Sequence, residues 1–300
     1  METMPTLPFE RLTVIGLGLI GGSMAMAAKE RFPHWQVCGI DPQSESLQFA
    51  LRHHIIDQAA LTLPEHFEDN QLIVIACHVT PALEVLRQLA PCIQGRNIWV
   101  TDIGSCKQKI GALGQTLLPT QFLAGHPMAG KEFSGITHAT PLLFAGKSYL
   151  LCPHEQSDPQ LLANLQTFVR ALGAHPKLID AETHDRYMAY VSHLPQLYAV
   201  MLTQLLDRNE PGRLMAYHGA GLDDQLRLAA SPYPMWGDIL YQNAEHLETA
   251  LLGLRAVIDE ALPLLREGNA EGLKVWFDRA NEMHGQFLGL QANRSGLPLL

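Results

Sequence analysis

The sequence lacks the features that would assign it to a membrane, secreted or nucleic-acid-binding class. No apolar run approaches the roughly 18 to 20 residues that a membrane-spanning helix needs. The first ten residues do not combine a basic flank with an apolar core, as a secretion signal does. No run of basic residues occurs and the formal net charge is −9, which argues against general affinity for nucleic acid or for an anionic membrane.

Cysteine pairs and metal-ligand spacing are also missing. The five cysteines are odd in number, widely spaced and mostly inside apolar runs, without a C-x-x-C pair. Such cysteines are typical of reduced thiols, so we expect a cytoplasmic protein. The 14 histidines show neither H-x-x-x-H nor H-E-x-x-H spacing and do not group with the cysteines, so we expect no metal site.

What the chain does carry is a glycine-rich turn between a short apolar strand, residues 12–15, and a helix rich in Ala and Met. Three glycines follow G-x-G-x-x-G spacing: the first permits a tight turn, the second lets a pyrophosphate approach, and the third lets the helix pack on the strand. An ordinary βα turn is the alternative. The residues that we expect to contact a dinucleotide here are Gly16, Gly18, Leu19, Ile20 and Gly21.

An acidic residue follows at the distance that dinucleotide sites require. The expected strand 36–40 ends at Asp41, about twenty residues beyond Gly21, where a carboxylate accepts hydrogen bonds from ribose hydroxyls. The same carboxylate repels the 2′-phosphate of NADP, and residues 42–44 supply no Arg or Lys to offset it. NAD is therefore the favoured cofactor, with NADP as the alternative.

Further apolar runs predict strands of the same sheet, whose carboxyl ends face the cofactor crevice. One run leads to His78, which either contacts the cofactor or is an ordinary loop histidine. Another leads to Asp102 and Ser105, which face the cofactor, cap the next helix, or do both. A third leads to His126 in a Gly-His-Pro-Met-Ala-Gly loop, where a catalytic role and a packing role are equally consistent with its position.

The pattern changes near residue 178, where long helical periodicity replaces the strands. We predict an α/β fold with a Rossmann-type doubly wound sheet in residues 1–178, followed by an all-α domain in residues 179–300. The apolar surplus of the helices predicts a homodimer through the second domain.

Two helical segments place polar groups among apolar neighbours. Pro195 should kink its helix, and His193 and Gln196 lie on one face beside that kink; the alternative is that His193 is a buried core imidazole. Arg227 lies in an apolar helix, where it either pairs with Asp223 on the same face or binds an anionic substrate.

Taken in order, these motifs resemble those of the prephenate/arogenate dehydrogenases of tyrosine biosynthesis. The resemblance covers nearly the whole chain and implies oxidative decarboxylation of prephenate or arogenate with NAD. Besides the glycine turn, the motifs that carry it are Asp102-x-Gly104-Ser105-x-Lys107, His126-Pro127-Met128-Ala129-Gly130, His184-Asp185, Ser192-His193-Leu194-Pro195 and the segment from Arg227 to Met235-Trp236.

The resemblance also implies roles for single residues. His126 accepts the proton of the ring hydroxyl, Ser105 orients His126, and Arg227 holds the ring carboxylate that leaves as carbon dioxide. The other residues expected around the substrate are Glu132, His184, His193, Gln196 and Trp236.

Two departures from the family pattern leave the substrate open. Gln196 replaces a histidine of prephenate-specific relatives, and the position of Asp223 differs from the basic residue of some members. The keto acid prephenate and the amino acid arogenate both stay candidates, with a slight preference for arogenate. No regulatory module accompanies the two expected domains, so tyrosine feedback would act at the active site.

Two other functions, both of which use a bound dinucleotide, are alternatives to this one. A β-hydroxyacid dehydrogenase would need a catalytic lysine on the helix 181–207, which contains none. A sensor that binds NAD without turnover would not need His126, Ser105 and Arg227 together.

Overall fold

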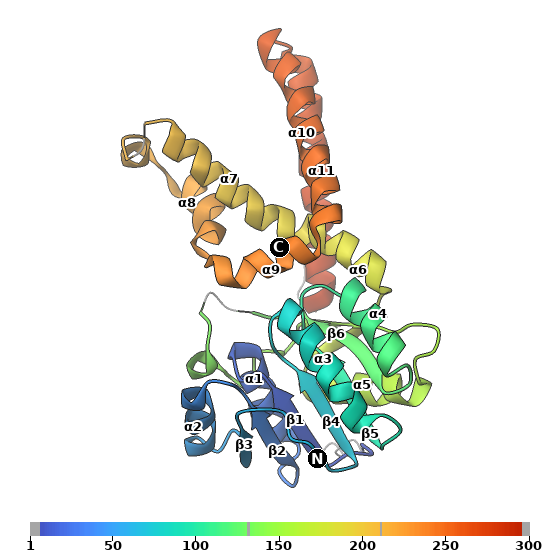
Figure 1. The fold of residues 1–300 in the computed structure, drawn as a ribbon. Coiled ribbons are helices and arrows are strands. Elements are labelled where there is room, and N and C mark those ends of the chain that lie inside the picture. The colour runs from blue at the N-terminus through green and yellow to red at the C-terminus, as the bar shows by residue number, and fades with distance from the viewer. Residues whose placement is uncertain (1–6, 131–132, 211, 296–300) are drawn as a thin grey trace. The chain divides into compact units, whose positions relative to one another are not determined.

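The structure, a computed structural model, describes residues 7–130, 133–210 and 212–295. The chain divides into two compact units, Met1–His246 and Leu247–Leu300. The first unit holds an eight-stranded sheet with its flanking helices and a further group of helices, and the second holds most of a long helical hairpin (Figure 1). A Rossmann-type sheet followed by helices confirms the predicted fold class.

The sheet has the order β3-β2-β1-β4-β5-β6-β7-β8. The pairings from β3 to β6 are parallel, β7 is antiparallel to β6, and β8 is parallel to β7. Strand order reverses between β1 and β4, the place where ligands bind in open α/β sheets. The bounds are β1 Arg11–Ile15, β2 Gln36–Ile40, β3 Gln58–Ala60, β4 Gln71–Ile75, β5 Ile98–Asp102, β6 Phe122–Pro127, β7 Ser148–Cys152 and β8 His175–Leu178.

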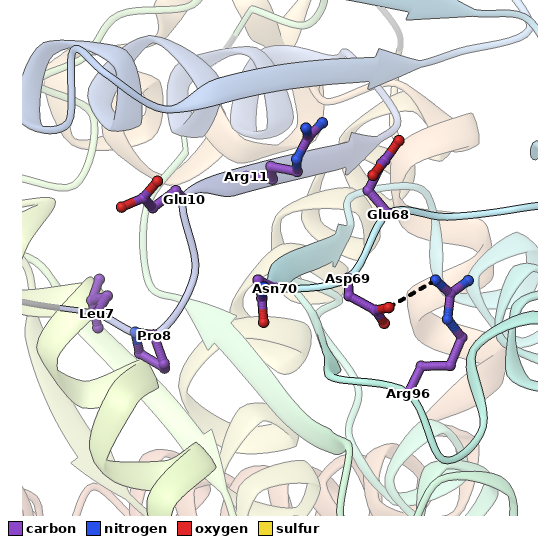
Figure 2. A pocket seen from close by; sticks show the side chains of 8 residues that line it. All are labelled: Leu7, Pro8, Glu10, Arg11, Glu68, Asp69, Asn70 and Arg96. Carbon is purple, nitrogen blue, oxygen red and sulfur yellow. Dashed lines mark hydrogen bonds and ion pairs between the residues drawn. The ribbon is translucent and has the colours of Figure 1, made fainter.

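A cavity of about 590 Å³ lies at the amino-terminal ends of β1, β4 and β5, on the side of the sheet opposite to the carboxyl ends of these strands (Figure 2). Arg96 and Asp69 form an ion pair of 3.1 Å in its wall, and Arg11 and Asn70 also line it. Because ligands of such sheets bind beyond the carboxyl ends of the strands, this cavity is not the candidate active site.

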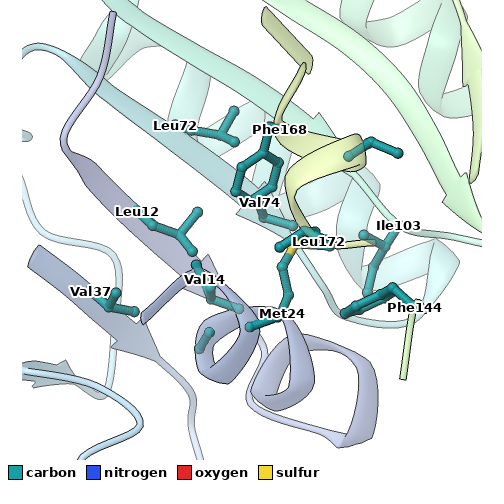
Figure 3. Packing of buried hydrophobic residues seen from close by; sticks show 14 of the residues in the cluster. Leu12, Val14, Met24, Val37, Leu72, Val74, Ile103, Phe144, Phe168 and Leu172 are labelled. Atoms are coloured by element: carbon teal, nitrogen blue, oxygen red, sulfur yellow. The ribbon is translucent and has the colours of Figure 1, made fainter. Parts of the chain in front are cut away.

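Hydrophobic cores cover both faces of the sheet. Alternate strand residues point to opposite faces: Val14 and Val74 face one core, and Ile15 and Ile75 face the other. Figure 3 shows Met24 and Phe168 packed over the first face. This face is covered by α1 Leu19–Arg31, α2 Ser44–Arg52 and α5 Pro159–Ala171, and the other by α3 Val79–Ile93 and α4 Gln108–Leu117.

The chain after β8 is helical. The helix expected over 181–207 is interrupted by a π-helical turn, η2 Ala189–His193, directly before the next helix, whose first turn contains Pro195. The other elements after β8 are α6 Ala181–Met188, α7 Leu194–Arg208, a 3₁₀ turn η3 Leu214–Tyr217, α8 Ala220–Leu226, a 3₁₀ turn η4 Arg227–Ala230, α9 Tyr233–Gln242, α10 Ala244–Arg266 and α11 Ala270–Ser295.

Helices α6 to α9 belong to the same compact unit as the sheet. The division into domains at residue 178 therefore stays a prediction. The second unit contains most of α10 and all of α11, joined through Gly268 with a φ of +63°. Within the described part of the chain, none of the helices is both long and apolar enough to cross a bilayer.

Two glycines of α4 offer a matched test of helix–strand packing. A methyl group on Gly114 would overlap the fully buried ring of Phe122, so Gly114→Ala should lower the free energy of unfolding by about 1–3 kcal/mol. A methyl group on Gly111 would meet nothing closer than 3.8 Å, so Gly111→Ala should raise it by about 0.5–1 kcal/mol. Denaturant unfolding measures both, and equal destabilisation by the two would contradict this packing.

Candidate active site

The glycine turn has the geometry that close approach of an anion requires. Gly16 has a φ of +101°, and a Cβ there would lie 2.6 Å from the carbonyl oxygen of Ala76. A Cβ on Gly21 would overlap the carbonyl oxygen of Gly16, whereas Gly18 faces open space. Helix α1 begins at Leu19, and its start has neither a side-chain cap in the described residues nor an acidic residue in its first turn. The turn therefore fits a pyrophosphate group bound at the helix start.

Asp41 lies beside this turn, directly after β2. Its Oδ2 accepts a hydrogen bond of 2.7 Å from the Leu17 amide, and its Oδ1 accepts one of 2.8 Å from the Gln43 amide. These bonds fix the carboxylate at the carboxyl edge of the sheet. Each oxygen keeps acceptor capacity, which fits a diol such as a ribose.

The other two predicted cofactor residues differ in their placement. His78 is exposed and immediately precedes α3. The side chain of Asp102 is only 1% exposed and forms an ion pair with Lys107, and its oxygens also accept from the Gly104 and Gly125 amides. The carboxylate is therefore occupied by groups of the protein, and the assignment of Asp102 to the cofactor site stays a prediction.

Lys107 is a fully buried lysine for which the motif alone gave no role. Its Nζ donates to Asp102 and also donates a hydrogen bond of 2.7 Å to the carbonyl oxygen of Gly125, the residue before His126. Burial of the two charges is offset by their pairing and by these hydrogen bonds. Lys107 therefore ties the end of β5 to β6 where His126 emerges.

The start of α4 is capped by neither Asp102 nor Ser105, contrary to one of the sequence-based alternatives. The cap comes from α6: the carboxylate of Asp185 accepts hydrogen bonds of 2.7 Å from the Lys107 amide and 2.9 Å from the Gln108 amide. Ser105 stays half-buried in the turn between β5 and α4. Asp185 is a site residue that the sequence motif contained but did not assign.

His126, His184 and Asp185 form a chain of contacts. His126 Nδ1 lies 2.9 Å from His184 Nε2, and His184 Nδ1 lies 2.7 Å from Asp185 Oδ1. His184 has no exposed surface, and both of its ring nitrogens face these two partners. Both ring nitrogens thus contact groups of the protein, and the assignment of His184 to the substrate site stays a prediction.

The protonation states in this chain follow from burial. Loss of solvent, with the nearby His184, Lys107 and His193, holds the pKa of His126 well below its usual range. Burial also lowers the pKa of His184 despite the adjacent carboxylate. Burial alone would raise the pKa of Asp185, but hydrogen bonds from His184 and two backbone amides outweigh it and lower that pKa. Both imidazoles are therefore neutral near pH 7, and Asp185 is ionised.

His193 lies on η2, beside the same group of residues, and is 1% exposed. The Asn243 amide nitrogen donates to the carbonyl oxygen of Asp185 at 2.7 Å and lies 3.0 Å from His193 Nδ1. The indole of Trp236 meets the His193 ring edge-on, with centroids 6.2 Å apart, and its Nε1 is buried without a partner among the described residues. His193 is thus a buried, hydrogen-bonded imidazole that also contacts a predicted substrate residue.

Gln196 lies on α7 and Arg227 on η4, two elements that pack against each other. Gln196 is 3% exposed, and its Nε2 donates a hydrogen bond of 2.8 Å to the carbonyl oxygen of Leu228. Arg227, next to Leu228, is exposed. One alternative from the sequence pairs Arg227 with Asp223. The Oδ1 of Asp223 lies 3.3 Å from His218 Nε2. Glu132 lies outside the described residues.

Two family models match successive parts of the chain. The prephenate dehydrogenase nucleotide-binding domain matches residues 24–178, and the prephenate dehydrogenase dimerization domain matches residues 180–279. The chain belongs to the prephenate dehydrogenase family. It is therefore an oxidoreductase with a nucleotide-binding domain, and the sensor and β-hydroxyacid dehydrogenase alternatives are set aside.

Relatives of this family agree in sequence and in structure. A prephenate dehydrogenase of Bacillus subtilis is 31% identical over 97% of this chain and 76% of that protein. A cyclohexadienyl dehydrogenase of Zymomonas mobilis is 28% identical over 80% of this chain and 83% of that protein. A crystal structure of A. aeolicus prephenate dehydrogenase with hydroxyphenyl propionate and NAD⁺ has a TM-score of 0.87 at 25% identity, covering 94% of this chain and all of that one. A crystal structure of Synechocystis arogenate dehydrogenase has a TM-score of 0.80 at 25% identity, covering 92% of this chain and 99% of that one.

Stability should fall with acidity because His193 is buried in its neutral form. Burial, opposed in part by Asp185, lowers the pKa of His193 to about 4, whereas an unfolded histidine titrates near about 6.5. Between these values His193 binds up to one proton more in the unfolded chain than in the folded chain. Its contribution to the free energy of unfolding should therefore decrease by about 1.4 kcal/mol for each pH unit lost between about 6.5 and 4.

Denaturant unfolding at a series of pH values between about 8 and 4 measures this slope. His193→Gln removes the titrating group and keeps a polar side chain, so its slope should be shallower than that of the native chain over this interval. Equal slopes in the two proteins would show that His193 does not titrate in this way.

Proposed function

We propose that this chain catalyses the NAD-dependent oxidative decarboxylation of prephenate or arogenate. The observation that carries the proposal is His126, a neutral imidazole held at the carboxyl edge of the sheet, where the switch in strand order and the glycine turn also lie. A neutral imidazole suits proton abstraction at neutral pH. NAD, when bound at the glycine turn, supplies the hydride acceptor.

The chain's own residues hold the substrate and move one proton. His126 takes the proton of the ring hydroxyl, and Ser105 orients that hydroxyl toward it. Arg227 binds the ring carboxylate that departs as carbon dioxide, since a guanidinium matches a carboxylate with two parallel hydrogen bonds. His193, Trp236 and Glu132 line the substrate site in this proposal, and aromatisation of the ring drives loss of the carboxylate.

Cofactor binding is assigned to the glycine turn, Asp41 and His78. The uncapped start of α1 beside Gly18 supports the pyrophosphate position. Asp41 supports NAD over NADP because its carboxylate, fixed by the Leu17 and Gln43 amides, would repel a 2′-phosphate. In the turn, the assigned residues are Gly16, Gly18, Leu19, Ile20 and Gly21.

Gln196 favours arogenate over prephenate. A backbone carbonyl only accepts hydrogen bonds, so the bond to Leu228 fixes the amide nitrogen of Gln196 on that side. Its Oε1 then remains as an acceptor, buried without a donor in the described residues. If the substrate side chain lies beside Gln196, as in the family pattern, an ammonium group satisfies this oxygen, whereas a keto oxygen would repel it.

We also propose a homodimer formed by residues 179–300, in which a second copy covers the apolar faces of the helical hairpin. The family's dimerization domain matches residues 180–279 of this region, and exposed apolar helix faces favour association. The exposed apolar residues of the hairpin include Leu252, Ile258, Leu262 and Leu265 on α10, and Val275, Trp276, Phe277, Met283 and Phe287 on α11.

Two further expectations belong to this proposal. Tyrosine, an amino acid with a hydroxylated ring, would compete at the substrate site, where Gln196 Oε1 would accept from its ammonium group. The five cysteines are free thiols, which supports a reducing compartment such as the cytoplasm.

Spectroscopic detection of reduced cofactor tests the reaction. Prephenate and arogenate are each offered with NAD and with NADP, and NAD should support turnover with at least one substrate. His126→Asn should retain NAD binding and lose about 10²- to 10⁴-fold in kcat, the usual worth of a general base. His34→Asn, an exposed histidine between α1 and β2, is the control. Full turnover by His126→Asn, or no turnover in any mixture, would contradict the proposal.

The ratio of activities with the two substrates tests Gln196. Gln196→Leu removes the unpaired acceptor, so kcat/KM for arogenate should fall about 10-fold or more, since a hydrogen bond to a charged group is worth about 1.5–3 kcal/mol. The value for prephenate should change less. Gln225→Leu, an exposed glutamine on α8, serves as the control, and an unchanged ratio in Gln196→Leu would remove Gln196 from substrate selection.

A further inference from the structure

The carboxylate of Asp185 fixes the position of one proton on His184. Asp185 accepts hydrogen bonds from the Lys107 and Gln108 amides, so these two backbone donors hold its orientation. An ionised carboxylate has no proton to donate. The contact of 2.7 Å between His184 Nδ1 and Asp185 Oδ1 therefore requires the proton to be on His184 Nδ1.

The state of His184 then determines the state of His126. A neutral imidazole carries one proton, so a proton on His184 Nδ1 leaves Nε2 of that ring as an acceptor. His184 Nε2 lies 2.9 Å from His126 Nδ1, and this contact is favourable when His126 Nδ1 carries the proton. Nε2 of His126 is then the nitrogen with the free electron pair.

We propose that Asp185 and His184 are positioning residues that select the neutral His126 tautomer with the proton on Nδ1, so that His126 Nε2 is the base. This inference rests on the proposed function, because it names the atom that accepts the substrate proton. The proton of the ring hydroxyl goes to Nε2, and His126 becomes an imidazolium that keeps its Nδ1 hydrogen bond to His184. Asp185 stabilises that positive charge through the intervening ring.

The other charges around His126 do not replace this arrangement. Lys107 faces the site from the turn after β5, but its ammonium group is paired with Asp102. His193 on η2 is neutral, and its Nδ1 lies 3.0 Å from the amide nitrogen of Asn243. Burial of the three histidines keeps them uncharged near pH 7. Asp185 is thus the carboxylate that contacts the His126–His184 pair directly.

Nitrogen NMR of the free enzyme, labelled at histidine with ¹⁵N, reads the tautomer without any turnover. The native chain should show His126 with a protonated Nδ1 and an unprotonated Nε2. His184→Phe removes the acceptor and should shift His126 toward the form with a protonated Nε2. A native His126 with its proton on Nε2 would overturn the proposal by itself, even if no variant folds.

Two substitutions at one position separate tautomer selection from packing. His184→Phe should lower kcat about 5- to 150-fold, the effect of one mismatched buried hydrogen bond, with little change in KM. His184→Gln offers an amide oxygen to His126 Nδ1 and should recover kcat to within about threefold of the native enzyme. Equal kcat in His184→Phe and the native enzyme, or no recovery in His184→Gln, would overturn the proposal.

Asp185 is tested against a second carboxylate with a similar structural role. Asp238 on α9 accepts a hydrogen bond of 2.7 Å from the Thr80 amide at the start of α3, as Asp185 does at α4, but it contacts no histidine in the described residues. Asp185→Asn and Asp238→Asn should both lower stability, whereas only Asp185→Asn should lower kcat, by about fivefold or more. Equal effects on kcat would show that Asp185 acts only as a cap.

The NMR and kinetic results distinguish failure of this inference from failure of the proposed function. If His126 shows the expected tautomer and His184→Phe reverses it, but none of the substrate mixtures turns over, the reaction is wrong and the tautomer assignment stands. If turnover occurs but the tautomer is reversed in the native chain, the reaction stands and this inference fails.

Discussion

The buried ion pair between Lys107 and Asp102 is the interaction on which the candidate site depends. It joins the end of β5 to the turn before α4, and the bond from Lys107 to the Gly125 carbonyl extends this link to β6. The backbone amide of the same lysine binds Asp185 of α6. Removing either partner would leave an isolated charge in a solvent-free position, which typically costs about 3–5 kcal/mol. One residue thus connects the sheet, His126 and the helical segment.

Features set by local sequence could be predicted, and those set by distant partners could not. The glycine turn and Asp41 follow from spacing within about thirty residues, because a tight turn and a buried strand restrict the local sequence. The cap of α4 comes from Asp185, 77 to 78 residues away, while a local rule considers Asp102 and Ser105 alone. The motif around His184 likewise does not show that its two ring nitrogens contact His126 and Asp185, because His126 lies 58 residues away in the sequence. The three-residue strand β3 was too short to give a hydrophobic pattern.

Two buried amides show how a backbone carbonyl determines what a side chain offers. Asn243 is oriented by the Asp185 carbonyl and uses the same nitrogen for His193, so both of its contacts are made within the protein. Gln196 is oriented by the Leu228 carbonyl, but no donor among the residues that the structure describes reaches its oxygen. An unmet buried acceptor costs about 1–3 kcal/mol. The difference between the two amides marks Gln196 as the one suited to recognise a ligand.

Helices α1, α3 and α4 all begin at the carboxyl edge of the sheet, and each start carries a partial positive charge. The acids Asp238 and Asp185 neutralise the starts of α3 and α4, whereas the described part of the chain supplies no side-chain cap for α1. Helix α2 Ser44–Arg52 also begins at this edge without a side-chain cap in the described residues, but it carries the acidic Glu45 in its first turn. Among these four helices, α1 is thus the one whose start has neither a described side-chain cap nor an acid in its first turn. The positive end of α1 would attract a phosphate-bearing ligand more strongly than the other three helix starts, which positions the ligand along the edge before any specific contact with its bases or sugars forms.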